Sequence, residues 1–193
     1  MTTQVWAVLI GSYLLGSIPS AYIAARLVLG KDIWQLGDGN MGAKNTFHSV
    51  GKVAGALVAG ADIGKGALAV QMARSFHLSD NVVLLAGACA VLGHDFPLLV
   101  RFRGGQGMAT MIGVFGLLFP TQTVLALIAL AVTLAITRNW DLSCGVGFVF
   151  LVGATWLAGQ PLKRALYPVV LLPTIGLRKL LQTWQARRAT ISS

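Results

Sequence analysis

The sequence of 193 residues contains no glutamate, and charged residues of all kinds make up only 11% of it. A typical soluble domain is about 25% charged and about 45–50% apolar. This chain is 55% hydrophobic, with a mean hydropathy of +0.73. This high hydrophobic fraction with few charged residues argues against an ordinary water-soluble domain, a disordered chain and a coiled coil. Because a membrane-spanning helix needs about 20 apolar residues, the chain is long enough for six or seven spans and little else.

Several signatures of enzyme chemistry are also missing. The two cysteines, Cys89 and Cys144, lie far apart in apolar segments, with no disulfide framework and no metal or redox spacing. Neither a Ser-His-Asp arrangement, nor a metal-ligand cluster, nor a Walker phosphate-binding motif follows from the spacing. The residues ahead of the first apolar run, Thr2 to Gln4, carry no basic side chain. We therefore expect that run to be a span and not a signal peptide.

Positive charge dominates the little charge that is present. Fifteen lysines and arginines stand against six aspartates, a formal charge of +9. In a soluble protein this excess would suggest nucleic-acid binding. In a membrane protein, lysine and arginine collect on the cytoplasmic side and contact anionic lipid. We therefore expect membrane lipid, and no nucleic acid, as the partner of this charge.

The chain consists of apolar segments separated by short polar loops. The predicted spans cover residues 5–29, 53–76, 82–100, 108–137, 142–157 and 165–181. The segment 108–137 is long for one span and has a turn-like Phe119-Pro120 pair in its middle, so it counts as two short spans or as one kinked helix. With seven spans and the N-terminus outside, most of the basic residues face the cytoplasm, as the positive-inside rule requires. We predict an all-α integral membrane protein with about seven transmembrane helices, comprising one polytopic domain at residues 1–181 and a basic cytoplasmic tail at residues 182–193.

Two of the predicted cytoplasmic loops are unlike ordinary connectors. Loop 1 (residues 31–51) contains Gly37-Asp38-Gly39-Asn40-Met41-Gly42-Ala43-Lys44-Asn45, and loop 2 (residues 101–107) reads Arg101-Phe102-Arg103-Gly104-Gly105-Gln106-Gly107 just before a helix start. Glycines let backbone N–H groups converge on an anion, and asparagine, lysine and arginine side chains add donors. The alternatives are a flexible connector for loop 1 and, for loop 2, a turn whose arginines anchor a span at the lipid head groups. We favour an electropositive pocket that binds a phosphorylated ligand.

Ionisable residues within apolar segments are costly and usually functional. Asp62 and Lys65 are three residues apart, so they share one helix face, either as a functional pair or as a packing pair. His94 is placed near the cytoplasmic end of its segment, as a general base or as a hydrogen-bond partner of a loop. Arg138 is either a further phosphate ligand or a snorkelling anchor. His48 follows the glycine-rich part of loop 1, close to the proposed anion site.

Five motifs, in order and in register, carry a family resemblance. They are Gly16-Ser17-Ile18-Pro19, Gly37-x-Gly39-Asn40-x-Gly42-Ala43-x-Asn45, Asp62-x-x-Lys65-Gly66, Gly93-His94-x-Phe96-Pro97 and Phe102-Arg103-Gly104-Gly105-x-Gly107-x-Ala109-Thr110. Over essentially its whole length the sequence resembles the acyl-phosphate-dependent glycerol-3-phosphate acyltransferases, the PlsY family of bacterial phospholipid synthesis. The resemblance implies a seven-helix enzyme of the bacterial plasma membrane, with its active-site loops in the cytoplasm. Such an enzyme moves a fatty acyl group from acyl phosphate to the 1-hydroxyl of glycerol 3-phosphate, releasing phosphate and giving lysophosphatidic acid. The resemblance implies no metal and no other cofactor, and it leaves the oligomeric state open, with a monomer as one option.

The resemblance also implies which residues form the site. The substrate-binding residues would be Asp38, Gly39, Asn40, Lys44, Asn45, His48, Arg103, Gly104, Gly105, Gln106, Gly107 and Arg138. The catalytic group would be His94 with Asp62 and Lys65, organising the loops from beneath. The chain departs from the family's usual residues at Asp38, Lys44, His48, Gln106, Asn139 and Asp141, and it has Pro173 and Gly176 where the family has a histidine and an asparagine. Two other functions stay open: a divergent paralogue that uses another acceptor or only binds lipid or a partner, and a small transporter or channel.

Overall fold

The computed structural model of the chain describes residues 3–191, with the side chains of residues 3–184. Over these residues the chain forms α-helices and two short 3-10 helices, and no strand. The predicted all-α class is therefore confirmed. The described residues fall into two compact units, the larger from Met1–Val114 with Pro173–Ser193 and the smaller from Phe115–Leu172. The larger unit contains both glycine-rich loops, and the smaller unit contains Arg138.

The first apolar segment is two helices and not one. Helix α1 (Thr3–Gly16) and helix α2 (Ser20–Leu29) are separated by a short break that contains Pro19. Proline has no N–H and clashes with a preceding helical turn, so the helix stops before it and restarts after it. Helix α2 ends at Gly30, whose left-handed φ of 65° lets its N–H bond to the carbonyl of Arg26. Glycine reaches this conformation without the steric cost that other residues meet.

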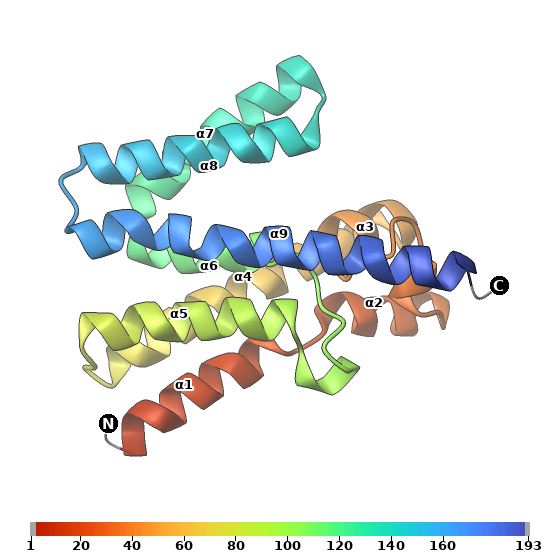
Figure 1. Ribbon diagram of the computed structural model, residues 1–193, viewed down its shortest axis with the longest axis horizontal. Helices are drawn as coiled ribbons and strands as arrows, with labels where there is room; N and C mark the ends of the chain where they lie inside the picture. Colours follow the sequence, from red (N-terminus) through yellow and green to blue (C-terminus); the bar gives the residue numbers. More distant parts are fainter. Residues whose placement is uncertain (1–2, 192–193) are drawn as a thin grey trace. The chain divides into compact units, whose positions relative to one another are not determined.

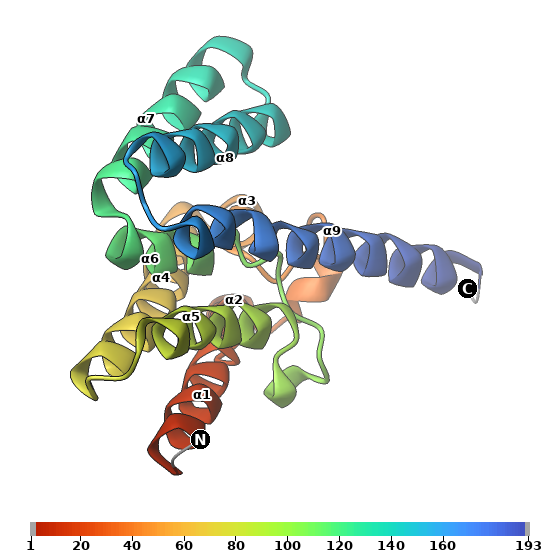
Figure 2. The same ribbon diagram turned by 60° about the vertical axis from the view of Figure 1, so that its left-hand side comes forward.

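Close glycine contacts hold the long helices of the larger unit together. Helix α4 (Lys52–Ser75), helix α5 (Asp80–Asp95) and helix α6 (Met108–Leu118) follow in the chain. A side chain at Gly16 of α1 would overlap the backbone of α5, and one at Gly66 of α4 would overlap the backbone of α6. Small residues allow this close approach where lipid supplies little hydrophobic driving force between helices. Figures 1 and 2 both show α1 and α5 side by side.

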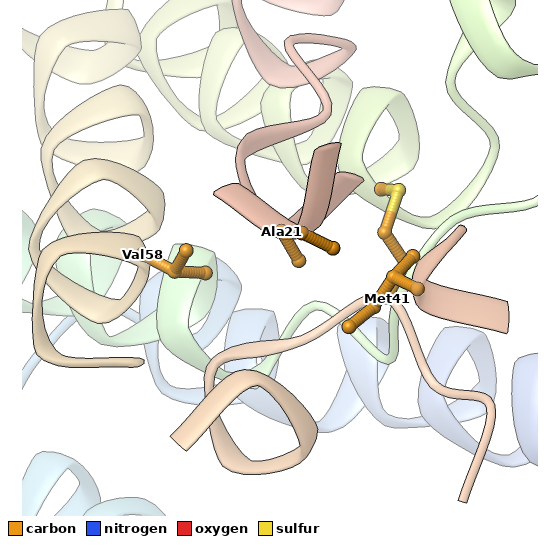
Figure 3. Close-up of a cluster of buried hydrophobic side chains, with 5 residues drawn as sticks. Ala21, Met41 and Val58 are labelled. Carbon is orange, nitrogen blue, oxygen red and sulfur yellow. The ribbon is translucent and has the colours of Figure 1, made fainter. Parts of the chain in front are cut away.

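Loop 1 is folded and packs on the helices that flank it. It contains the 3-10 helix η1 (Ile33–Gln35) and helix α3 (Ala43–Ser49). Its buried apolar side chains join those of α2 and α4 in one cluster, of which Figure 3 labels Ala21, Met41 and Val58. The cluster consists of Ala21, Ala25, Ile33, Met41 and Val58. The flexible-connector alternative for loop 1 is therefore not what the structure shows.

Loop 2 joins helix α5 to helix α6 through the 3-10 helix η2 (Leu98–Val100). Its first two residues, Arg101 and Phe102, have left-handed φ values of 55° and 60°. Gly107 ends the loop with a φ of 69° immediately before α6 begins. Three left-handed positions within seven residues turn the chain sharply back on itself.

The smaller unit is a helical hairpin together with the end of α6 and the start of the last helix, α9 (Leu162–Ile191). Helix α7 (Pro120–Thr137) and helix α8 (Trp140–Leu157) run side by side in Figures 1 and 2. Helix α7 begins at Pro120 and α6 ends at Leu118, so the predicted break in the segment 108–137 is confirmed. Proline suits the first position of a helix because that N–H has no helical partner. The hairpin turn ends α7 at Arg138, with a left-handed φ of 53°, and begins α8 with the side chain of Asn139 accepting from the N–H of Leu142.

Each predicted apolar segment is helical, but not every helix has the length and hydropathy of a span. Among the described residues, five stretches are long and apolar enough to cross a membrane: Thr3–Leu29, Lys52–Ser75, Asp80–Val100, Pro120–Thr137 and Trp140–Leu157. Helix α6 is apolar but has 11 residues. The last helix, α9 (Leu162–Ile191), continues through the predicted boundary at residue 181. The count of seven spans and the separate tail at residues 182–193, of which 192 and 193 lie outside the described residues, stay predictions.

Candidate active site

Asn45 is the centre of the hydrogen bonding in loop 1. Its side chain is buried, and its Nδ2 donates to the carbonyls of Leu36 at 2.9 Å and Asn40 at 3.0 Å. Its Oδ1 accepts from the hydroxyl of Ser49 at 3.0 Å and from the N–H of Asp38 at 3.3 Å. These bonds use the amide fully, so Asn45 orders the loop from inside. A direct contact of Asn45 with substrate would require some of them to open, and that role stays a prediction.

The Asp38 carboxylate is used within the loop as well. Its Oδ1 accepts from the backbone N–H of Asn40 at 3.0 Å, which makes a local turn of the kind that aspartate favours. Gly39 follows Asp38 with a left-handed φ of 68°. Lys44 and His48 lie one helical turn apart on α3, both exposed. The structure thus places the predicted loop 1 residues together, with Asp38 serving the turn.

The glycines of loop 2 are needed because the loop lies directly on its neighbours. A side chain at Gly104 would overlap the carbonyls of His94 and Asp95, and one at Gly105 would overlap His94 Nε2 and the Met41 carbonyl. The N–H of Gly105 donates to the His94 carbonyl at 3.2 Å. Loop 2 therefore touches the end of α5 on one side and loop 1 on the other.

Several N–H groups of loop 2 are not used in the backbone hydrogen bonding of the fold. Among the described residues, the N–H groups of Gly104, Gln106 and Gly107 make no backbone hydrogen bond, and the first N–H groups of α6 follow them. N–H groups at a helix start point outward and favour an anion. Loop 2 is therefore tightly packed on its neighbours and has N–H groups that make no backbone hydrogen bond, and its role as an anion cradle stays a prediction.

Arg103 is tied to loop 1 by an aromatic residue that the sequence did not single out. The indole Nε1 of Trp34 donates to the Arg103 carbonyl at 3.2 Å, and the Arg103 guanidinium lies 4.8 Å from the Trp34 ring centroid. Tyr22 of α2 packs on the same indole, with ring centroids 5.2 Å apart. A cation over an indole face is attracted by the ring's quadrupole. Trp34 thereby holds an exposed cationic side chain beside both loops.

A buried charge cluster lies directly beneath loop 2. Lys65 Nζ is 2.8 Å from Asp62 Oδ1, and His94 Nδ1 is 3.6 Å from the same oxygen. All three side chains are at most 4% exposed. The ion pair expected from the spacing of Asp62 and Lys65 is present, and Lys65 Nζ also donates to the Ile18 carbonyl at 3.2 Å. That carbonyl belongs to the break before Pro19, so the cluster joins α1, α4, α5 and loop 2. Its catalytic role stays a prediction.

Helix α9 adds two residues that the sequence analysis missed. The Arg178 side chain is 2% exposed and donates from Nε and Nη2 to the Gly104 carbonyl, at 3.1 Å and 2.7 Å. Gln182 Nε2 donates to Asn40 Oδ1 at 2.9 Å, and Gln182 Oε1 accepts from Gln106 Nε2 at 3.2 Å. The available signal was that Arg178 lies within the predicted apolar segment 165–181, where an ionisable residue is usually functional. The Gln182 contacts had no sequence signal.

Arg138 lies in the smaller unit, where it ends helix α7. Its N–H donates to the Leu134 carbonyl. Asp141, a departure from the family pattern, lies in the first turn of α8. A carboxylate there interacts favourably with the positive end of the helix dipole. The predicted ligand role of Arg138 stays a prediction.

Comparison with known proteins finds relatives along most of the chain. The sequence profile described as glycerol-3-phosphate acyltransferase matches residues 6–189. Glycerol-3-phosphate acyltransferase 2 of Dehalococcoides mccartyi is 38% identical over 169 residues, which cover 86% of this chain and 80% of the relative. The glycerol-3-phosphate acyltransferase of Bacillus cytotoxicus is 40% identical over 178 residues, 82% of this chain and 86% of the relative.

Solved structures show the same fold. Crystal structures of PlsY, an integral membrane glycerol 3-phosphate acyltransferase, match with TM-scores of 0.85 for the glycerol 3-phosphate form and 0.81 for the lysophosphatidic acid form. The sequence identities are 28% and 27%, and the matches cover 96% and 95% of this chain and 92% and 93% of the solved chains. On its sequence and its fold, this chain belongs to the glycerol-3-phosphate acyltransferase family.

Proposed function

We propose that the chain is an integral membrane acyltransferase that moves a fatty acyl group from an acyl phosphate to the 1-hydroxyl of glycerol 3-phosphate. The hydroxyl oxygen attacks the acyl carbonyl carbon, the bond from that carbon to the phosphate oxygen breaks, and phosphate leaves. The hydroxyl proton passes to a phosphate oxygen, so the reaction needs no protein side chain as a general base. The products are lysophosphatidic acid and phosphate.

The single observation that supports this proposal is that the two glycine-rich loops contact each other next to the buried cluster of Asp62, Lys65 and His94. Both substrates are phosphorylated, and loop 2 offers a row of N–H donors at the start of α6 with the Arg103 guanidinium beside it. Acyl phosphate has a good leaving group, so positioning and charge stabilisation supply most of what the reaction needs. We assign Arg103 and the loop 2 N–H groups to phosphate binding. The cluster of Asp62, Lys65 and His94 supports the loops from beneath.

An apolar groove supplies a place for the acyl tail. It lies between α2 and α4, has a volume of about 690 Å³ and is lined almost entirely by apolar side chains. This volume is within the range of about 300–1,000 Å³ found for small-molecule pockets. Ile18 lines the groove, and its carbonyl accepts the hydrogen bond from Lys65. Ile18 therefore connects the groove to the buried charge cluster, and we assign the groove to the acyl tail.

The proposed location is the bacterial plasma membrane with loops 1 and 2 in the cytoplasm. Loop 1 contains Lys31 and Lys44, and loop 2 contains Arg101 and Arg103. Basic loops of this length are retained on the cytoplasmic side. The phosphorylated substrates would then reach the site from the cytoplasm.

The testing experiment uses the pure protein in detergent or lipid with palmitoyl phosphate and labelled glycerol 3-phosphate. We expect labelled lysophosphatidic acid from the wild type, and from Arg103→Ala either no turnover or a raised KM for a phosphorylated substrate. Arg74→Ala is the matched control, because Arg74 is an exposed arginine in the last turn of α4, at the opposite end of that helix from loop 1. Lack of product from folded wild type would overturn the proposal, and a screen of other acceptors would then test the divergent-paralogue alternative.

A further inference from the structure

Gln182 is bonded to both glycine-rich loops at once. Its Nε2 donates to Asn40 Oδ1 of loop 1 at 2.9 Å and lies 3.4 Å from the Gly104 carbonyl of loop 2. Its Oε1 accepts from Gln106 Nε2 of loop 2 at 3.2 Å. Gln182, which is 76 positions from Gln106 and 142 from Asn40 in the sequence, therefore bridges the two loops.

Arg178 fixes the position of the Gln182 side chain on helix α9. The two residues are one helical turn apart, so they share a face of α9. The Arg178 guanidinium makes two hydrogen bonds to the Gly104 carbonyl and lies 5.9 Å from the Phe96 ring centroid. Hydrogen bonds from a charged group are about twice as strong as neutral ones. A buried arginine with these contacts anchors the helix on loop 2, and Gln182 then reaches across to loop 1.

Each loop has its own internal support. Loop 1 is ordered by hydrogen bonds of Asn45 to Leu36, Asn40, Ser49 and Asp38. Loop 2 is held on α5 by the bond from Gly105 to His94. Removing the Gln182 amide would leave both loops folded. It would take away one of the polar links between them, another being the hydrogen bond from Trp34 Nε1 to the Arg103 carbonyl.

We propose that Gln182 is a positioning residue for acyl transfer, which holds loop 1 and loop 2 at the spacing that aligns the two substrates. This inference rests on the proposed function, with the two substrates shared between the two loops. In-line attack needs the reacting atoms about 3–3.5 Å apart, and a displacement of about 1 Å can cost about 100-fold in rate. Loss of the bridge therefore acts on alignment and not on the binding of either substrate.

The test compares Gln182→Leu with wild type in the acyl-transfer assay. Leucine keeps most of the volume and removes every hydrogen bond. We expect kcat to fall by about 10- to 100-fold while the KM of each substrate stays within about threefold. Thr183→Ala is the matched control, because Thr183 is exposed on the next position of α9 and its hydroxyl bonds to Lys179 of the same helix; it should leave kcat unchanged. A Gln182→Leu protein with wild-type kcat, or with a raised KM and unchanged kcat, would overturn the proposal.

A second measurement separates this inference from the proposed function, because it needs no activity. Spin labels on Gln35→Cys of loop 1 and Arg101→Cys of loop 2, both exposed positions, report the spacing of the loops in a background with Cys89 and Cys144 replaced. We expect a wider distribution of label distances in Gln182→Leu and an unchanged one in Thr183→Ala. Unchanged distances in Gln182→Leu would overturn the bridging role even if the wild type makes product. Widened distances with no product from the wild type would keep the bridge and reject the proposed function.

Discussion

Replacing Lys65 by methionine tests how the buried charge cluster supports the site. The change keeps the length of the side chain and removes its charge, which leaves the Asp62 carboxylate, 2% exposed, without the cation now 2.8 Å away. At an effective dielectric constant of about 20, that attraction is about 6 kcal/mol. His94 lies 3.6 Å from the same oxygen and can compensate in part. Breaking a buried pair by removing one partner costs about 3–5 kcal/mol, and we expect a loss in that range.

The assay is thermal unfolding of the purified protein in detergent. For a chain of this size, about 2–4 °C of Tm is lost per kcal/mol, so Lys65→Met should melt about 6–20 °C below wild type. Asp62→Leu combined with Lys65→Met should regain most of the loss, because the uncompensated charge is then gone. Lys52→Met, an exposed lysine at the start of the same helix, is the control. The reasoning is refuted if Lys65→Met has the same melting temperature as Lys52→Met. It is also refuted if the double variant is no more stable than Lys65→Met alone.

Three further substitutions test the packing of two glycines and the contact between Trp34 and Arg103. Gly105→Ala should lower stability by about 1–3 kcal/mol and reduce turnover, because its methyl group would overlap atoms of both neighbours. Gly60→Ala, in a helix with open space beside it, should raise stability by about 0.5–1 kcal/mol; equal melting temperatures for the two variants would contradict this account. Trp34→Leu should raise the KM of a phosphorylated substrate by about two- to fivefold, since a cation–aromatic contact of about 0.5–1 kcal/mol to Arg103 is lost. Steady-state kinetics with each substrate varied in turn would check it, and an unchanged KM for both would count against Arg103 being held by the indole.

Local features of the chain were predictable from the sequence because they depend on neighbours along it. Pro120 marks the start of α7, and the apolar segments on either side of it are both helical. Asp62 and Lys65, three residues apart, pair as the helical repeat requires. In each case the controlling factor is a backbone restriction or a helical period, and both act within a few residues.

The assembly of the site was decided by tertiary structure alone. The sequence predicts an anion cradle from the glycines of loop 2, and the structure adds that Gly105 is needed because His94 and Met41 lie against it. Asn45, whose ligand role stays a prediction, orders loop 1 from inside through bonds that the sequence does not reveal. Arg178 and Gln182 reach the loops from 74 or more residues away in sequence, and no local pattern encodes such a contact. Hydropathy and spacing determine which segments become helices, whereas the site depends on which helix faces meet, and that follows from the packing of the whole larger unit.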